Sequence, residues 1–224
     1  KAMQCALQVH DINVFAYLHL VWMWTMDFYE VPRRKALLQS TESLRAIHAY
    51  DKKDSMLGCQ GICYEAHLLL HGHPPDPEDE AFAIFLTAEE VAQQPPLMTN
   101  SYHLPLMRAY YILGDRPNTL HCWALLRAAI KDSAGTHGFY DFLFWGAMVP
   151  LTLGNLSDEE TNSLLEDSLA ALAKLATVAP TYFHPKLHCL QAEQLRRAEA
   201  PYTEVYCAYE KAFHQADAAG LHCM

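Results

Sequence analysis

The sequence predicts an all-α protein in which about five antiparallel helical hairpins stack into a superhelix, an α-solenoid. Apolar residues recur at three- and four-residue steps along most of the 224-residue chain, which is the helical period. Proline and glycine interrupt this pattern at short intervals, so about ten helices with short connections are expected. We find no alternating apolar run bounded by a two-residue hairpin turn, which argues against β-strands.

Two of the expected helices have N-terminal signals. Asp76 begins an acidic run ahead of a helix through Phe82, and Ser157 with the acidic residues 158–160 precedes an apolar stripe over 164–176. A side chain such as Ser or Asp can cap the first turn, and acidic residues there favour the positive end of the helix dipole. We therefore expect helices to begin at both places.

Two segments share a helix–turn–helix pattern. In 109–129, Gly114 ends the first helix and alanines occupy the second. In 192–219, the residues 198–200 replace the usual glycine turn, so we expect looser packing there. A small residue at the end of a helix lets the chain turn tightly, and alanines in the second helix let the two backbones approach closely.

The last segment, 202–222, carries Glu, His and Cys, yet its apolar residues favour a structural role. The pattern Y-E-K-A-F-x-x-A is similar to the second helix of a tetratricopeptide unit. Tyr209 and Phe213 are then expected to fill the groove toward a neighbouring unit. One face of this helix carries Val205, Tyr209, Ala212, Phe213 and Ala216.

A longer stretch carries several motifs in a fixed order. Phe139-Tyr140-Asp141 begins an aromatic-rich helix, 179–186 forms an Ala-Pro-x-x-Phe-x-x-Lys turn, and Ala192-Glu193 follows. A Tyr-Glu-x-Ala helix then ends in Gly220-Leu221-His222. This order resembles the tetratricopeptide-like helical region of very large signalling proteins of bacteria and fungi, best over 98–224. Tyr182 stands where that family has Asn, and Pro185 is added, so a reshaped turn is expected.

In those proteins a serine/threonine-kinase-like domain precedes an AAA-type ATPase module. The helical region follows, and GAF sensor and histidine-kinase domains often come next. The resemblance implies that 1–224 is a single helical-repeat domain and a fragment of a larger chain. It implies a non-catalytic regulatory module of a signal-transduction kinase, which couples an ATPase module to an output domain.

The expected partner is another domain of the same chain, or a protein or peptide that binds the concave surface of the superhelix. The predicted contact residues on the inner helices are Tyr102, His103, Arg108, Tyr140 and Asp141.

The composition limits the other partners. Hydrophobic residues make up 51% of the chain, enough to bury a core. The net charge of −10 argues against nucleic acid and against anionic membrane surfaces, because both attract basic proteins. The longest apolar run, 14–26, is too short for membrane insertion. Seven cysteines without a framework pattern indicate reduced thiols in a cytoplasmic protein.

Catalytic motifs are missing from the sequence. It has no Gly-x-Ser-x-Gly elbow, no phosphate-binding loop and no histidine-kinase ATP box. His121-Cys122 and His188-Cys189 are sequence neighbours, and neighbours on a helix point about 100° apart, so they form poor dyads. We therefore predict no catalytic residue, no cofactor and no enzyme activity for this segment.

Two alternative interpretations stay open. A stand-alone adaptor, or the small-molecule-sensing domain of a transcription activator, would have the same fold. A metal- or redox-responsive module would use four residues spaced one helical turn apart. Structural zinc draws ligands from two elements, so a second pair would have to come from His121-Cys122 or His188-Cys189, and no metal is the favoured interpretation. The four candidates are Cys59, Cys63, His67 and His71.

Overall fold

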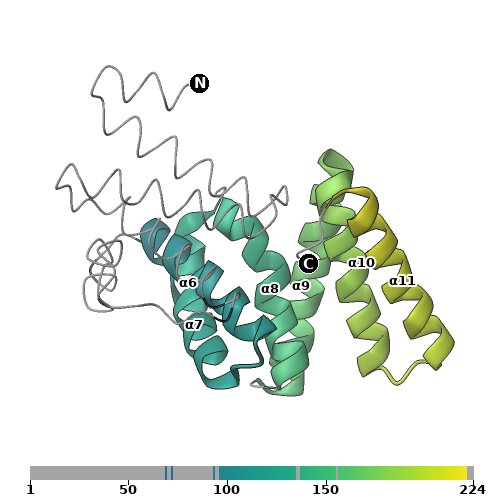
Figure 1. Cartoon of the computed structure of the whole chain (residues 1–224), viewed down its shortest axis with the longest axis horizontal. Helices are drawn as coiled ribbons and strands as arrows, with labels where there is room; N and C mark the ends of the chain where they lie inside the picture. Colours follow the sequence, from purple (N-terminus) through teal and green to yellow (C-terminus); the bar gives the residue numbers. More distant parts are fainter. Residues whose placement is uncertain are drawn as a thin grey trace. The chain divides into compact units, whose positions relative to one another are not determined.

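The computed structural model describes Leu69, Gly72, Gln93 and residues 96–134, 137–154 and 156–220. The described elements are all helical, which confirms the all-α prediction for this part of the chain (Figure 1). None of these helices is long and apolar enough to cross a membrane. The expected helix through Phe82 lies outside the described residues. In order, the elements are α6 (Pro96–Ile112), α7 (Arg116–Ala129), the 3-10 helix η2 (Ile130–Ser133), α8 (His137–Leu153), α9 (Asp158–Val178), α10 (Pro180–Arg197) and α11 (Tyr202–Ala218).

The chain divides into two compact units, Lys1–Ser133 and Ala134–Met224. In the described part of the first unit, α6 packs against α7, and η2 contacts both helices. In the second unit each helix packs against the next one along the chain, and α8 also contacts α10. Packing between consecutive helices is what stacked hairpins require. The superhelix of about five hairpins and the single domain over 1–224 stay predictions.

Large side chains of α7 are buried in the hairpin that α7 forms with α6. Trp123 and Leu126 are buried at helical spacing, while Ala124 and Ala128 are exposed. The expectation that alanines bring this helix close to its partner is therefore wrong for Ala124 and Ala128, because bulkier residues take the inner face, while Ala129 is half-buried. Asp115 caps α7 by accepting a hydrogen bond from the Asn118 amide at 3.2 Å.

In the second unit, the largest fully buried side chains come from three helices and are Phe144 on α8, Leu172 on α9 and Leu190 on α10. α11 packs against α10 and contributes Ala212 and Ala216, which are both buried, as predicted for alanines in the second helix of a hairpin. The distance between two packed helices depends on the side chains at their contact, and small side chains such as alanine make it shorter.

The predicted start of α9 is also confirmed. Ser157 Oγ accepts a hydrogen bond from the Glu160 amide at 3.3 Å, and the Glu160 carboxylate accepts one from the Ser157 amide at 3.3 Å. These reciprocal bonds form a capping box, which satisfies two amides that a helix start would otherwise leave open.

The first helices of both hairpins end in the same turn. After α6, the Asp115 amide donates to the Tyr110 carbonyl at 2.9 Å, and after α10 the Ala200 amide donates to the Leu195 carbonyl at 3.1 Å. The residue before each of these amides is left-handed, with φ of 74° at Gly114 and 52° at Glu199. This is the Schellman arrangement. The turn at 198–200 keeps its backbone hydrogen bonds without a glycine, because Glu199 takes the strained conformation. The looser packing expected there stays a prediction.

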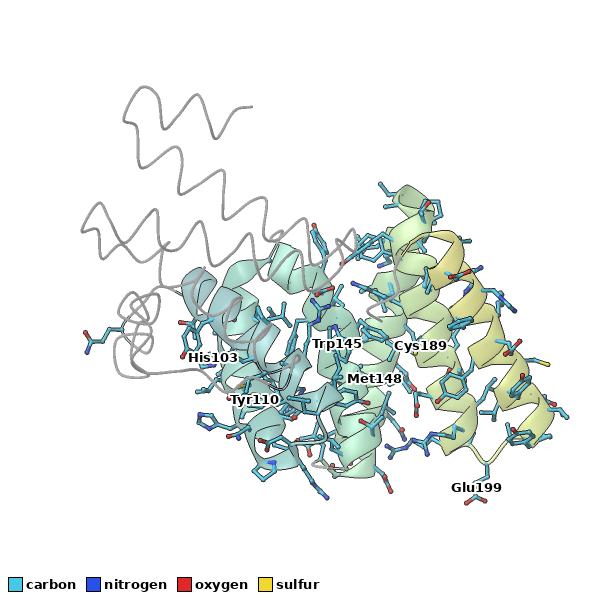
Figure 2. All side chains as sticks on the ribbon, in the orientation of Figure 1. His103, Tyr110, Trp145, Met148, Cys189 and Glu199 are labelled. Atoms are coloured by element: carbon cyan, nitrogen blue, oxygen red, sulfur yellow. The ribbon has the colours of Figure 1, made fainter. Side chains whose placement is uncertain are left out.

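We expect Glu199→Gly to raise the free energy of unfolding by about 0.5–1 kcal/mol. A left-handed residue with a Cβ costs about 1–2 kcal/mol, and glycine removes that cost at some loss of chain entropy. Glu199 lies at the tip of the α10–α11 connection and points away from both helices (Figure 2). Urea denaturation of Glu199→Gly and Glu199→Ala separates the two effects, since alanine keeps the Cβ. An equal gain in both variants would contradict the backbone explanation.

Candidate functional site

A buried ion pair joins α8 to α10. The Lys186 ammonium donates a hydrogen bond to Asp141 Oδ1, and the two side chains are only 5% and 3% exposed. The Tyr182 hydroxyl donates to the same carboxylate oxygen at 2.9 Å. Lys186 Nζ also lies 2.6 Å from that hydroxyl and 3.9 Å from the centre of the Tyr182 ring. The three side chains together fix the first turns of α10 against the start of α8.

The start of α10 explains how these side chains meet. The segment expected to form a reshaped turn is mostly helical: Pro180 occupies the first turn and Pro185 lies inside the helix. Proline is tolerated in a first turn, where the missing amide has no helical partner. Tyr182 and Lys186 are four residues apart, so they share one helix face. Residues 180–186 are therefore helix and not turn, and the expected departure from the form in the signalling proteins stays a prediction.

The predicted contact residues lie in both units. Three are on α6 and two on α8; His103 and Asp141 are buried, and the other three are half-buried. The carboxylate of Asp141 is paired with the buried Lys186, a pairing that the sequence did not indicate. The partner surface around these residues stays a prediction.

The four metal candidates Cys59, Cys63, His67 and His71 lie outside the described residues.

A second polar cluster joins α10 to α11. The buried Glu193 carboxylate accepts hydrogen bonds from the Tyr209 hydroxyl and from Arg196 Nε, the latter at 2.8 Å. Burial raises the pKa of Tyr209, and the bond to Glu193 raises it further. Burial, with the charge of Glu193, raises the pKa of the Cys189 thiol to about 12. Cys189 therefore stays a protonated thiol at neutral pH, which suits neither a nucleophile nor a metal ligand.

His103 is a buried histidine on α6. Burial, with a smaller contribution from the charge of His121, lowers its pKa to about 4. Its Nδ1 is buried and has no hydrogen-bond partner among the described residues. His103 is therefore neutral at pH 7, and its ring packs edge-on against Tyr102 with centroids 4.9 Å apart.

We expect this histidine to make the protein less stable in mild acid. Between pH 6.5 and 4 the unfolded chain binds a proton at His103 that the folded chain does not, so the free energy of unfolding falls as the pH falls. At pH 5 the loss is roughly 1–2 kcal/mol, from about 1.4 kcal/mol per pKa unit. Urea denaturation at pH 7 and pH 5 measures it, with His103→Leu as the comparison. An equal loss in both proteins would contradict the assignment.

The exposed face of α11 carries large aromatic side chains. Tyr202, Tyr206 and Phe213 are 80%, 50% and 64% exposed, and their positions fall within about 40° around the helix axis. The rings of Tyr202 and Tyr206 stack with centroids 6.0 Å apart. We call these three residues the aromatic face. The sequence predicts that Phe213 fills a groove toward a neighbouring unit, and among the described residues no unit covers it.

The sequence signal for the aromatic face was available but incomplete. Spacings of four and seven residues place Tyr202, Tyr206 and Phe213 on one side of a helix. The apolar face predicted from the sequence includes Phe213 but neither Tyr202 nor Tyr206. The helical pattern does not tell which part of a broad apolar face a neighbouring helix covers.

No family model, curated protein or solved structure matches the chain. The resemblance to the helical region of signalling kinases therefore stays an expectation. Among the described residues, no group of three or more His, Cys, Asp and Glu could hold a metal ion. What the described geometry offers is a helical stack joined by two polar clusters, with an aromatic face on its last helix.

Proposed function

We propose that the chain is a non-catalytic interaction module of a multidomain signal-transduction kinase, in which it couples an ATPase module to an output domain. The observation that carries this proposal is the aromatic face of α11. Tyrosine and other large aromatic residues dominate binding hot spots, because they bury much area with few rotatable bonds. Three exposed rings along one side of a single helix suit such a docking surface.

The charges beside the aromatic face favour a basic partner. Glu210 and Asp217 lie on its outer flank, within about 60° of its centre by helical geometry. The Tyr206 hydroxyl donates to Glu210 at 3.0 Å, which holds that carboxylate beside the rings. The expected occupant is an amphipathic helix with an apolar stripe and a Lys or Arg edge, supplied by an adjoining domain of the same protein.

The two polar clusters give this surface a rigid connection to the rest of the unit. Tyr209 on α11 bonds Glu193 on α10, and Lys186 on α10 bonds Asp141 on α8. A partner bound to α11 is therefore held in a fixed position relative to α8. These connected contacts support a role in coupling, because a displacement of α11 by a bound partner can be passed through α10 to α8.

The first test is the extent of the native polypeptide. Purifying the endogenous protein and mapping its peptides should reveal kinase, ATPase or GAF-type sequence joined to this region. A native polypeptide that holds none of these domains would contradict the kinase assignment. It would favour a stand-alone adaptor.

Hydrogen exchange tests the surface itself. We expect the amides of α11 to exchange more slowly in the native polypeptide than in the 224-residue chain, because the adjoining domain covers the helix. Phe213→Ser should abolish most of this difference, while Cys207→Ser, an exposed position away from the aromatic face, should preserve it. Equal exchange in the native polypeptide and the 224-residue chain would contradict the proposal.

A further inference from the structure

Two histidines on α10 are arranged as a pair. His184 and His188 are one helical turn apart, and their rings stack with centroids 5.6 Å apart and planes 27° apart. Both side chains are half-buried, so solvent reaches them. Histidines four residues apart on one helix face are the arrangement that places two imidazoles on one ion in helical zinc motifs.

A residue of α11 orients one of these rings. His188 Nδ1 is hydrogen-bonded to Oε1 of Gln215. An amide oxygen only accepts hydrogen bonds, so Nδ1 carries the proton and Nε2 keeps its lone pair. Histidine ligands of metal ions have this kind of outer support, which sets the tautomer and the ring orientation. The bond thus prepares Nε2 of His188 as a ligand.

The residues around the histidine pair determine which atoms can bind a metal ion. Lys211 on α11 places a positive charge near His188. The neighbouring Cys189 lies about 100° around the helix from His188, off the face that carries the pair. The donors are therefore imidazole nitrogens alone, and the pairing of His188 with Cys189 considered from the sequence is disfavoured.

We propose that His184 and His188 chelate a borderline divalent transition ion, such as Ni²⁺, Zn²⁺ or Cu²⁺, through two imidazole nitrogens. Such ions prefer imidazole, whereas Mg²⁺ prefers oxygen ligands. No third ligand of the His, Cys, Asp or Glu type completes the set among the described residues, so water fills the remaining positions. An ion held this way is exchangeable, unlike a structural zinc with four protein ligands.

A site-resolved titration tests the proposal in the whole chain. Carbethoxylation of each histidine is followed by mass spectrometry while Ni²⁺ is added, with Mg²⁺ as the control cation. We expect His184 and His188 to become protected together at one Ni²⁺ concentration, and Mg²⁺ to protect neither. In His184→Gln, protection of His188 should need at least about tenfold more Ni²⁺, because the second linked imidazole is lost. His214→Gln, on the exposed side of α11, should leave the titration unchanged.

For a second variant we expect tighter binding of the metal ion, a result that a misfolded protein would not give. Lys211 repels a bound cation, so Lys211→Gln should protect both histidines at a severalfold lower Ni²⁺ concentration. The proposal is overturned if His184 and His188 are protected at different Ni²⁺ concentrations. It is also overturned if His184→Gln leaves His188 unaffected, or if protection occurs only at other histidines.

Discussion

Replacing Lys186 by Met is expected to lower the free energy of unfolding by about 3–5 kcal/mol, because it leaves the Asp141 carboxylate buried without its cation. Methionine keeps most of the volume of the lysine stem, so the cavity that it creates is small. Guanidinium denaturation followed by far-ultraviolet circular dichroism measures the loss. The side chain of Asp141 is 3% exposed, so water cannot replace the missing partner cheaply.

The matched control removes both charges. Asp141→Leu combined with Lys186→Met should recover most of the stability, since replacing a buried ion pair by apolar groups is often neutral or stabilising. The Tyr182 hydroxyl then loses its acceptor, so the recovery stays incomplete. If Lys186→Met alone cost under about 1 kcal/mol, the pair would behave as an exposed salt bridge. That result would contradict its burial between α8 and α10.

Truncating Leu172 to alanine is expected to cost about 2–5 kcal/mol, because the side chain is fully buried and the change leaves a cavity. Leu172 lies on α9, the helix that packs against both α8 and α10. Val178→Ala provides the control on the same helix, since Val178 is 84% exposed and should change the free energy of unfolding by under about 0.5 kcal/mol. Equal effects at the two positions would show that α9 is not packed on both sides.

Features governed by neighbouring residues could be predicted from the sequence. The start of α9 follows from Ser157 and Glu160, which cap the helix within one turn. The turn after α6 follows from Gly114, because only glycine takes a left-handed conformation without strain. The burial of Ala212 and Ala216 follows from their spacing on α11. Each of these features depends on local geometry.

Features governed by tertiary packing could not be predicted in the same way. Asp141 and Lys186 are 45 residues apart, and charged residues are seldom buried, so nothing local pairs them. Glu199 occupies a left-handed position although its residue type disfavours it. The outward position of Phe213 depends on how much of α11 is covered by α10. The four-residue spacing of His184 and His188 is a sequence signal for the histidine pair, but the bond from His188 to Gln215 depends on how α10 and α11 pack.

The proposal that α11 is a docking surface is tested most directly by photo-cross-linking in the native polypeptide. A benzophenone amino acid replaces Phe213 in one protein and Lys211, on the other side of α11, in a second protein. The proposal predicts a cross-link from position 213 to a Lys- or Arg-edged helix of an adjoining domain of the same polypeptide, and none from position 211 to that helix. Cross-links of equal yield from both positions, or none from position 213 to an adjoining domain, would contradict it.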